Sequence, residues 1–262
     1  MKLGTSSARL GETPASYGIS MLGILLVMEV VCYTFDLPTY ILPPPSDVLP
    51  FLVARLSDFS AHFEATFTEV ALGFSMGWIL AVLLATGVVF IPFFGALVRP
   101  LIVMTQTVPV LAIAPILIMW FGFGIWGKVA TSALLVIFPV FVGVSDGLLN
   151  VPQRLLDFLR ASRANKYQIF WYVRVPQAVS SIIPATKIGI TLSIIGAVIG
   201  EFITAEYGIG LVIRQATVQM DTVKSFAMLY CLGLAGVTLY STLDVVEILL
   251  KRKFRQIEGG SP

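Results

Sequence analysis

The sequence predicts an all-α polytopic membrane protein with about six transmembrane helices. Hydrophobic residues make up 57% and charged residues 12% of the 262-residue chain, whereas a soluble domain has about 25% charged residues. Six apolar segments reach the roughly 20 residues that a helix needs to cross a bilayer. They are residues 17–35, 67–90, 101–121, 127–148, 180–204 and 225–249. The net charge of +2 is too small to suggest a nucleic-acid partner.

Residues 17–35 form the first predicted span. The segment is longer than the apolar core of a signal peptide and no small-residue cleavage site follows it, so we interpret it as retained in the membrane. Residues 36–66 then lead to the second span. They include three consecutive prolines, and Ser46, directly after them, is expected to cap a short helix that runs through Leu56.

Two prolines, Pro109 and Pro115, are expected to interrupt the third span, residues 101–121. Each removes a hydrogen bond within the helix and clashes with the preceding turn. Such a break is either a structural kink or a broken helix that lines a translocation pathway. Gln106 and Thr107 add polar groups at the same place, which favours the pathway.

Five carboxylates lie in or near the predicted spans, where ionisable groups are costly and often functional. They are Glu29, Glu69, Asp146, Glu201 and Asp244. We include Glu201 among the candidate pathway residues. Glu29 and Asp244 lie deeper, where a proton relay and a satisfied contact between helices are both open, and Lys187 is available to pair with an acid.

Two short motifs suggest chemistry but lack the residues that the chemistry needs. Gly122–Lys128 spells most of a phosphate-binding loop, yet Val129 stands where magnesium needs a hydroxyl, and no strand precedes it. Gly73–Gly77 matches a nucleophile elbow around Ser75, but it lies in a helical run, and the only histidine, His62, is in the outer segment. One histidine and two cysteines do not make a typical structural zinc site. We therefore expect no catalytic residue, no metal and no cofactor in this chain.

Pairs of glycines four residues apart point to structure rather than chemistry. Small residues at this spacing let membrane helices approach closely. The pairs are Gly73 and Gly77, Gly143 and Gly147, and Gly196 and Gly200. We expect each pair to lie where two helices pack.

Lysine and arginine are unevenly distributed among the segments that connect the spans. With the N-terminus inside, twelve of the 17 lie in inside segments: Lys2, Arg9, Arg99, Arg154, Arg160, Arg163, Lys166, Arg174, Lys251, Arg252, Lys253 and Arg255. Four lie outside: Arg55, Lys128, Arg214 and Lys224. Both termini are then cytoplasmic by the positive-inside rule. Residues 1–16 and 251–262 would be cytoplasmic tails of a single transmembrane domain, residues 17–250.

One long polar stretch, DFLRASRANKYQIFWYVRVP at residues 157–176, separates the fourth and fifth spans. Its cations place it on the cytoplasmic face. Tyr167, Phe170 and Trp171 share one face at helical spacing. Exposed aromatics on such a loop favour a protein partner, and the alternative is a helix that lies flat among the lipid headgroups.

Three stretches resemble the inner-membrane permease subunit of binding-protein-dependent ABC importers, of the nitrate/sulfonate/taurine and thiamine-precursor or riboflavin type. They are QTVPVLAIAPILIMWFGFG at 106–124, LLDFLRASRANKYQIFWYVRVPQAV at 155–179 and SIIGAVIGEFITAEYGIGLVI at 193–213. The likeness runs from about Pro45 to Leu250. It implies the type I ABC importer permease fold, with an ATPase-coupling loop at residues 151–176.

In that family the loop reads Glu-Ala-Ala, three residues, Gly, nine residues, Ile, one residue, Leu-Pro, and its short helix sits in a groove of the ATPase subunit. Counting back from Pro176, Asp157 takes the Glu position and Arg163 the Gly position. A left-handed bend is cheap only for glycine, so Arg163 is expected to resist it, and Asn165 is a candidate to adopt it instead. The resemblance implies these coupling residues: Asp157, Arg160, Arg163, Ala164, Asn165, Lys166, Tyr167, Phe170, Trp171 and Pro176.

The resemblance implies a permease subunit of an ATP-driven importer, which performs no covalent chemistry itself. Its partners would be a cytoplasmic ABC ATPase dimer, an external solute-binding protein, a second permease subunit expected to be identical, and the lipid bilayer. It would lie in the cytoplasmic (inner) membrane of a bacterium or archaeon, and ATP and magnesium would bind to the ATPase. The alternative of another class is a self-sufficient secondary transporter or channel, which would need inverted repeats or coupling-ion sites.

The predicted spans contain one clear cation, Lys187, whereas acids and aromatics are plentiful. An anionic solute needs cations or helix N-termini along its path, so these spans suit a neutral or weakly basic ring better. We therefore expect a vitamin-type heteroaromatic cargo, such as a thiamine pyrimidine precursor or riboflavin. A nitrate, sulfonate or taurine permease is the alternative within the family.

Overall fold

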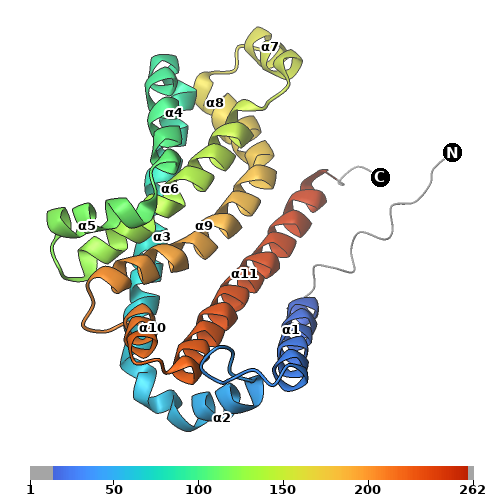
Figure 1. The fold of residues 1–262 in the computed structure, drawn as a ribbon. Helices are drawn as coiled ribbons and strands as arrows, with labels where there is room; N and C mark the ends of the chain where they lie inside the picture. The colour runs from blue at the N-terminus through green and yellow to red at the C-terminus, as the bar shows by residue number, and fades with distance from the viewer. Residues whose placement is uncertain (1–13, 259–262) are drawn as a thin grey trace. The chain divides into compact units, whose positions relative to one another are not determined.

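The computed structural model describes the backbone of residues 14–258 and the side chains of residues 18–247 other than those at 92, 105, 106 and 246. Every regular element within these residues is a helix (Figure 1). The elements are α1 Pro14–Thr34, α2 Pro45–Arg55, η1 Leu56–Phe59, α3 Ser60–Phe90, α4 Pro92–Thr107, α5 Val110–Phe121, α6 Ile125–Leu149, α7 Gln153–Ala161, α8 Lys166–Ile169, η2 Phe170–Arg174, α9 Val175–Ile203, α10 Ile209–Val218 and α11 Thr222–Glu258. The prediction of an all-α protein is confirmed.

Four helical segments within the described residues are long and apolar enough to cross a membrane. They are Pro45–Phe90, Ile125–Leu149, Lys166–Ile203 and Thr222–Val245, and shorter apolar helices cover Gly18–Thr34, Phe93–Met104, Val110–Phe121 and Ile209–Val218. The first predicted span corresponds to α1, and the third to α4 and α5 together. The sequence did not predict α10.

The break in the third span occurs at one of the two predicted prolines. Helix α4 ends at Thr107, Val108 is extended with φ −91° and ψ 125°, and Pro109 is the residue that caps the start of α5. Pro115 lies inside α5, which continues to Phe121. The predicted interruption at Pro109 is therefore confirmed and the one at Pro115 is wrong, because a proline within a helix bends it without having to end it.

The helices form two compact units along the chain. Among the described residues, one contains Pro14–Ser60 together with Val212–Ser241, and the other contains Ala61–Leu211 together with Thr242–Glu258. In the first unit the backbone N–H of Ser46 donates to Glu29 Oε2 at 3.0 Å, and the capping residue of α2 is Pro44 rather than Ser46. The predicted cap is wrong because Pro45, which lacks an N–H, occupies the first helical position. The carboxylate of Glu29 accepts a hydrogen bond from the N-terminus of α2. This agrees with the interpretation of Glu29 as an acid satisfied by a contact between helices.

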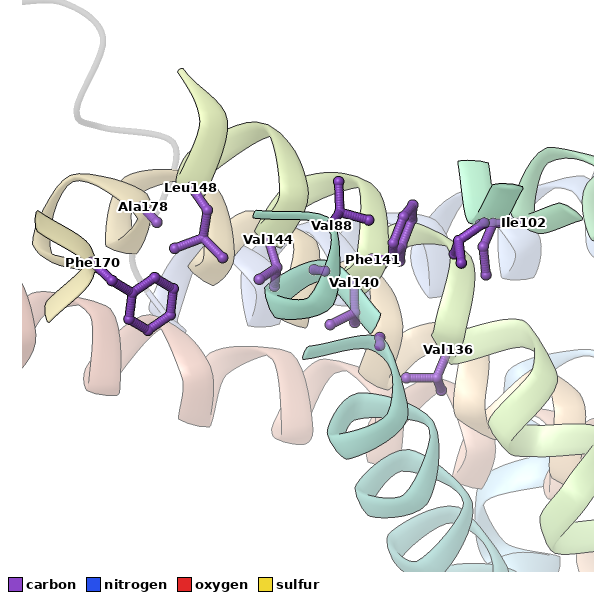
Figure 2. Close-up of a cluster of buried hydrophobic side chains, with 12 residues drawn as sticks. Val88, Ile102, Val136, Val140, Phe141, Val144, Leu148, Phe170 and Ala178 are labelled. Carbon is purple, nitrogen blue, oxygen red and sulfur yellow. The ribbon is translucent and has the colours of Figure 1, made fainter. Parts of the chain in front are cut away.

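Helix α6 is the centre of the second unit, where it packs along α9 and contacts α4 and α5. A hydrophobic core forms on its later turns with side chains from α3, α4, η2 and α9 (Figure 2). The core residues are Ala81, Ala85, Val88, Val98, Ile102, Val136, Val140, Phe141, Val144, Leu148, Phe170 and Ala178. Phe170 of the polar loop thus belongs to this core.

Glycine makes the close approach of α3, α6 and α9 possible. A Cβ atom on Gly73 of α3 would lie 2.3 Å from Ser132 Oγ, and one on Gly196 of α9 would lie 2.5 Å from Ser132 Cα. Ser132 of α6 lies between the two glycines and donates from its hydroxyl to the carbonyl of Ser193 at 2.9 Å. The interpretation of the glycine pairs as packing sites is confirmed here, because any larger side chain would push the helices apart.

Candidate functional site

The polar loop between α6 and α9 bends at Arg163. Helix α7 ends in a pair of hydrogen bonds, from Arg163 N to the carbonyl of Arg160 and from Ala164 N to the carbonyl of Leu159, each at 3.0 Å. Arg163 has φ 60°, so it holds the left-handed position of a Schellman motif. The expectation that Arg163 resists this conformation is wrong. The bend lies at the family's glycine position, and the arginine tolerates a backbone that costs about 1–2 kcal/mol for a non-glycine residue.

Asn165 has a different role from the predicted one. Its φ of −79° and ψ of 166° are extended, and its side chain accepts a hydrogen bond from the backbone of Gln168 at the start of α8. The Gln168 side chain in turn accepts from the backbone N–H of Asn165, and both bonds are 2.8 Å long. This capping box starts α8 directly after the bend.

A small hydrophobic cluster holds the two arms of the loop together. Val151, Leu156 and Ile169 are buried, and Leu155, Leu159, Ala164 and Val173 pack against them. The leucines repeat along one face of α7, which leaves Asp157, Phe158 and Arg160 exposed on the other. The loop is therefore a folded helical hairpin with an apolar interior.

The three aromatic residues of the predicted face divide between core and surface. Phe170 is 6% exposed, and its ring centroid lies 5.0 Å from that of Phe90 in α3. Tyr167 and Trp171 are 69% and 63% exposed. The prediction that Phe170 is an exposed docking residue is wrong, because α3 covers that part of the helix.

The π-helical turn η2 connects this hairpin to α9. Arg174, its last residue, donates from Nη1 to the carbonyl of Leu148 at 2.5 Å, next to the end of α6. Pro176 is half-buried near the start of α9, where a missing N–H costs little. These contacts fix the hairpin to the transmembrane helices that it follows and precedes.

We define the loop surface as the exposed residues Asp157, Phe158, Arg160, Arg163, Asn165, Lys166, Tyr167, Trp171 and Tyr172. Arg160 and Asp157 form an exposed ion pair at 3.4 Å. Both side chains are more than half exposed, so their charges are accessible to a partner. The surface combines aromatic rings with cations.

The candidate pathway residues lie in two separate places. Thr107 and Pro109 flank the break between α4 and α5, where the Thr107 hydroxyl donates to the carbonyl of Met104 at 2.8 Å. Pro115 is exposed within α5, and the side chain of Gln106 lies outside the described residues. Glu201 does not join them: it is completely buried in α9.

Glu201 instead belongs to a polar cluster that holds the start of α10. Thr66 donates from Oγ1 to Glu201 Oε1 at 2.6 Å, and Gly210 N donates to Glu201 Oε2 at 2.5 Å. The N–H of Ile209 donates to Thr66 Oγ1 at 2.8 Å, and the N–H of Gly208 donates to a ring nitrogen of His62 at 3.0 Å. Three successive N–H groups at this helix end are thereby satisfied. The place of Glu201 in the translocation pathway stays a prediction.

Two buried lysines pair with carboxylates. Lys128 of α6 pairs with Glu69 of α3, and Lys187 of α9 pairs with both Asp244 and Glu247 of α11. The pairing of Lys187 with an acid is confirmed. The pair of Lys128 and Glu69 was missed, because Lys128 was assigned to an outside segment. One signal in the sequence could have revealed this pair. Glu69 and Lys128 stand at those ends of the second and fourth predicted spans that face the same side of the membrane.

The sequence matches the family of binding-protein-dependent transport system inner membrane components over residues 73–256. The match covers more than half of the chain, so the protein belongs to this family, and it is a multi-pass inner-membrane transport subunit. The assignment decides against a self-sufficient secondary transporter or channel.

Individual relatives cover most of the chain. The formylaminopyrimidine transport permease protein ThiX of Halalkalibacterium halodurans is 31% identical over 229 residues, which are 87% of this chain and 91% of that protein. The riboflavin transport system permease protein RibX of Chloroflexus aurantiacus is 32% identical over 217 residues, 82% of this chain and 81% of that protein. The taurine transport system permease protein TauC of Escherichia coli is 27% identical over 207 residues, 76% and 75% respectively.

Proposed function

We propose that the loop surface docks on a cytoplasmic ABC ATPase and that the chain, paired with an identical copy, forms the membrane-spanning part of an ATP-driven importer. The observation that carries the proposal is the construction of the loop. Its aromatic and cationic side chains stand on a hairpin with its own apolar interior, and aromatic residues and arginine are enriched in protein interfaces. An external solute-binding protein delivers the cargo. ATP and magnesium bind to the ATPase, and this chain carries no cofactor.

The distribution of lysine and arginine supports an orientation with the loop and both termini in the cytoplasm. Ser57 is exposed in η1, in the segment proposed to face outwards. In a variant with Cys32 and Cys231 replaced by serine, a cysteine at Ser57 is expected to react with an impermeant maleimide on intact cells. A cysteine at Lys166 in the loop is expected to react only after the membrane is opened. Labelling of both positions from one side would contradict the orientation.

The buried charges support a cargo that is a neutral or weakly basic ring. Lys128 and Lys187 are each paired with carboxylates from other helices, so neither cation is available to a sulfonate or nitrate without losing its partner. Breaking a buried ion pair costs about 3–5 kcal/mol. The relatives that transport formylaminopyrimidine and riboflavin fit the same chemistry. Transport of taurine, nitrate or a sulfonate is the second candidate, favoured by the taurine permease among the relatives.

Uptake by the complete reconstituted importer tests this choice. Labelled aminopyrimidine, riboflavin, taurine and nitrate are supplied in parallel, each together with the solute-binding protein of this importer. We expect ATP-dependent uptake of one of the two ring compounds and none of the anions. Robust uptake of taurine or nitrate with no response to either ring would overturn the proposed cargo and leave the family assignment in place.

A further inference from the structure

Helix α2 connects the first membrane helix, α1, to α3. Its 11 residues span about 17 Å at 1.5 Å per residue, which is too short to cross the roughly 30 Å hydrocarbon layer. Arg55, with φ −120° and ψ 14°, interrupts the helix between α2 and η1, and α3, with 31 residues, is long enough to cross without α2. The connection formed by α2 and η1 therefore lies either in the water or at the membrane surface.

The chain between α1 and α2 turns back along α1, and both helices belong to the first compact unit. Asp36, with φ 46°, makes the turn directly after α1. Cys32 Sγ donates to the carbonyl of Leu42 at 3.5 Å. The N–H of Ser46 then donates to Glu29 Oε2 at 3.0 Å. The later residue of the connection thus pairs with the residue of α1 that lies further from the turn.

These hydrogen bonds fix the depth at which α2 begins. Glu29 is five residues before the end of α1 at Thr34, so the start of α2 lies about 8 Å from that end, on the membrane side, at 1.5 Å per residue. Tyr33 and Phe35 are exposed at the same end, and aromatic residues of membrane helices gather where lipid meets water. The start of α2 therefore lies within the headgroup layer and not in the water beyond it.

One side of α2 and η1 is aliphatic and exposed. Leu49, Val53 and Leu56 are spaced by four and three residues, which places them on the same side, and Val53 is 78% exposed. The exposed Asp47 stands two residues before Leu49, so it lies on the other side of the helix. Val48 is fully buried, so a third side packs within the protein.

This pattern suits lipid better than a protein partner. A helix that lies flat in the headgroup layer has an aliphatic side turned to the acyl chains and a charged side turned to water. Protein interfaces are enriched in aromatic residues and arginine, and leucine and valine are under-represented among their hot spots. The aliphatic side of α2 therefore favours acyl chains over a solute-binding protein or a second copy of the chain.

We infer that α2 and η1 lie in the headgroup layer of the membrane, with Leu49, Val53 and Leu56 against the acyl chains. The partner of this surface is the lipid itself. The leaflet is the outer one, and this part of the inference rests on the orientation given under the proposed function. The lipid contacts hold the connection between α1 and α3 on the membrane surface.

Environment-sensitive dyes on single cysteines test the inference, in the complete importer in lipid nanodiscs with Cys32 and Cys231 replaced by serine. Dyes on Leu49→Cys and Val53→Cys are expected to be quenched by a lipid nitroxide near the headgroup more than by one at the end of the acyl chain, because such a helix is buried only about 5–10 Å deep. The matched control is Ala54→Cys, at the next exposed residue, whose dye is expected to be quenched by iodide in the water instead.

Other quenching patterns overturn the inference. Iodide quenching of the dyes on Leu49→Cys and Val53→Cys would place the aliphatic side in water. Protection of these dyes only after the solute-binding protein is added would assign the surface to that protein. Shielding from both iodide and lipid nitroxides under all conditions would assign it to a second copy of the chain.

The leaflet is tested separately from the lipid contact. In right-side-out membrane vesicles, a nitroxide lipid confined to the outer leaflet is expected to quench the dye on Val53→Cys. Quenching from the inner leaflet alone would support the helix in the headgroup layer and overturn the proposed orientation. Quenching from neither leaflet would overturn the inference and leave the orientation standing.

Discussion

Alanine substitutions at Phe170 and Tyr167 separate the support of the coupling loop from its docking surface. Phe170 belongs to the buried core together with Leu148 and Ala178 (Figure 2). Its ring centroid lies 5.0 Å from that of Phe90. Removing a buried phenylalanine side chain costs about 3–5 kcal/mol. A change of 1 kcal/mol shifts the melting temperature of a chain of this size by about 2–4 °C, so Phe170→Ala is expected to lower it by on the order of 10 °C.

Tyr167→Ala is expected to weaken binding of the ATPase without lowering the stability of the permease. The side chain is largely exposed, and its ring centroid lies 5.6 Å from that of Phe90, which packs against the core. An exposed side chain of this kind changes stability by about 0.5 kcal/mol, whereas an aromatic anchor in an interface contributes about 2–4 kcal/mol to binding. We expect normal stability, weaker retention of the ATPase by about 30-fold or more, and loss of uptake.

The assay is the thermal unfolding of the purified permease, followed by tryptophan fluorescence, together with the amount of ATPase that copurifies. Tyr40→Ala, at an exposed tyrosine outside the loop, is the control for loss of a surface ring. The reasoning is refuted if Phe170→Ala melts at the wild-type temperature but releases the ATPase. It is also refuted if Tyr167→Ala binds the ATPase and transports normally.

Two further predictions concern the charge cluster at α9 and the bend of the loop. Lys187→Met removes the cation that the buried Asp244 and the half-buried Glu247 share, so we expect a loss of about 3–5 kcal/mol of stability. The triple variant with Asp244→Asn and Glu247→Gln is expected to recover most of it in the same unfolding assay; equal stability of the single variant and the wild type would contradict the ion-pair account. Arg163→Gly is expected to stabilise the loop by about 1 kcal/mol because glycine accepts the left-handed backbone. Arg163→Ala, which removes the charge but keeps the strain, is the matched control, and an equal gain from both substitutions would refute the backbone explanation.

Some features of the fold follow from local composition and were predictable. The spans of α3, α6, α9 and α11 are long apolar runs, and their lengths match the bilayer whatever their neighbours are. The glycine pairs predicted close packing because glycine has no Cβ atom and lets two helix axes approach closely. The chain break at Pro109 follows from the missing N–H and the steric clash of the ring.

Other features depend on which helix covers a residue. Helical spacing grouped Tyr167, Phe170 and Trp171 on one face, but Phe90 from α3 buries only one of the three rings. The donors that satisfy Glu201 come from α3 and from the start of α10, and no local pattern connects these segments.

The sequence by itself determined the class of protein, the approximate places of the long apolar segments, and the loop that we propose to face the ATPase. These properties depend on the period and length of apolar runs and on the placement of charge, which are local. Only the tertiary structure decided that Arg163 takes the left-handed bend, that Phe170 is core, and that Glu69, Lys128 and Glu201 form one cluster. The reason is physical: the surroundings of a side chain come from residues distant in the chain, and their contacts outweigh local conformational preference when the helices pack.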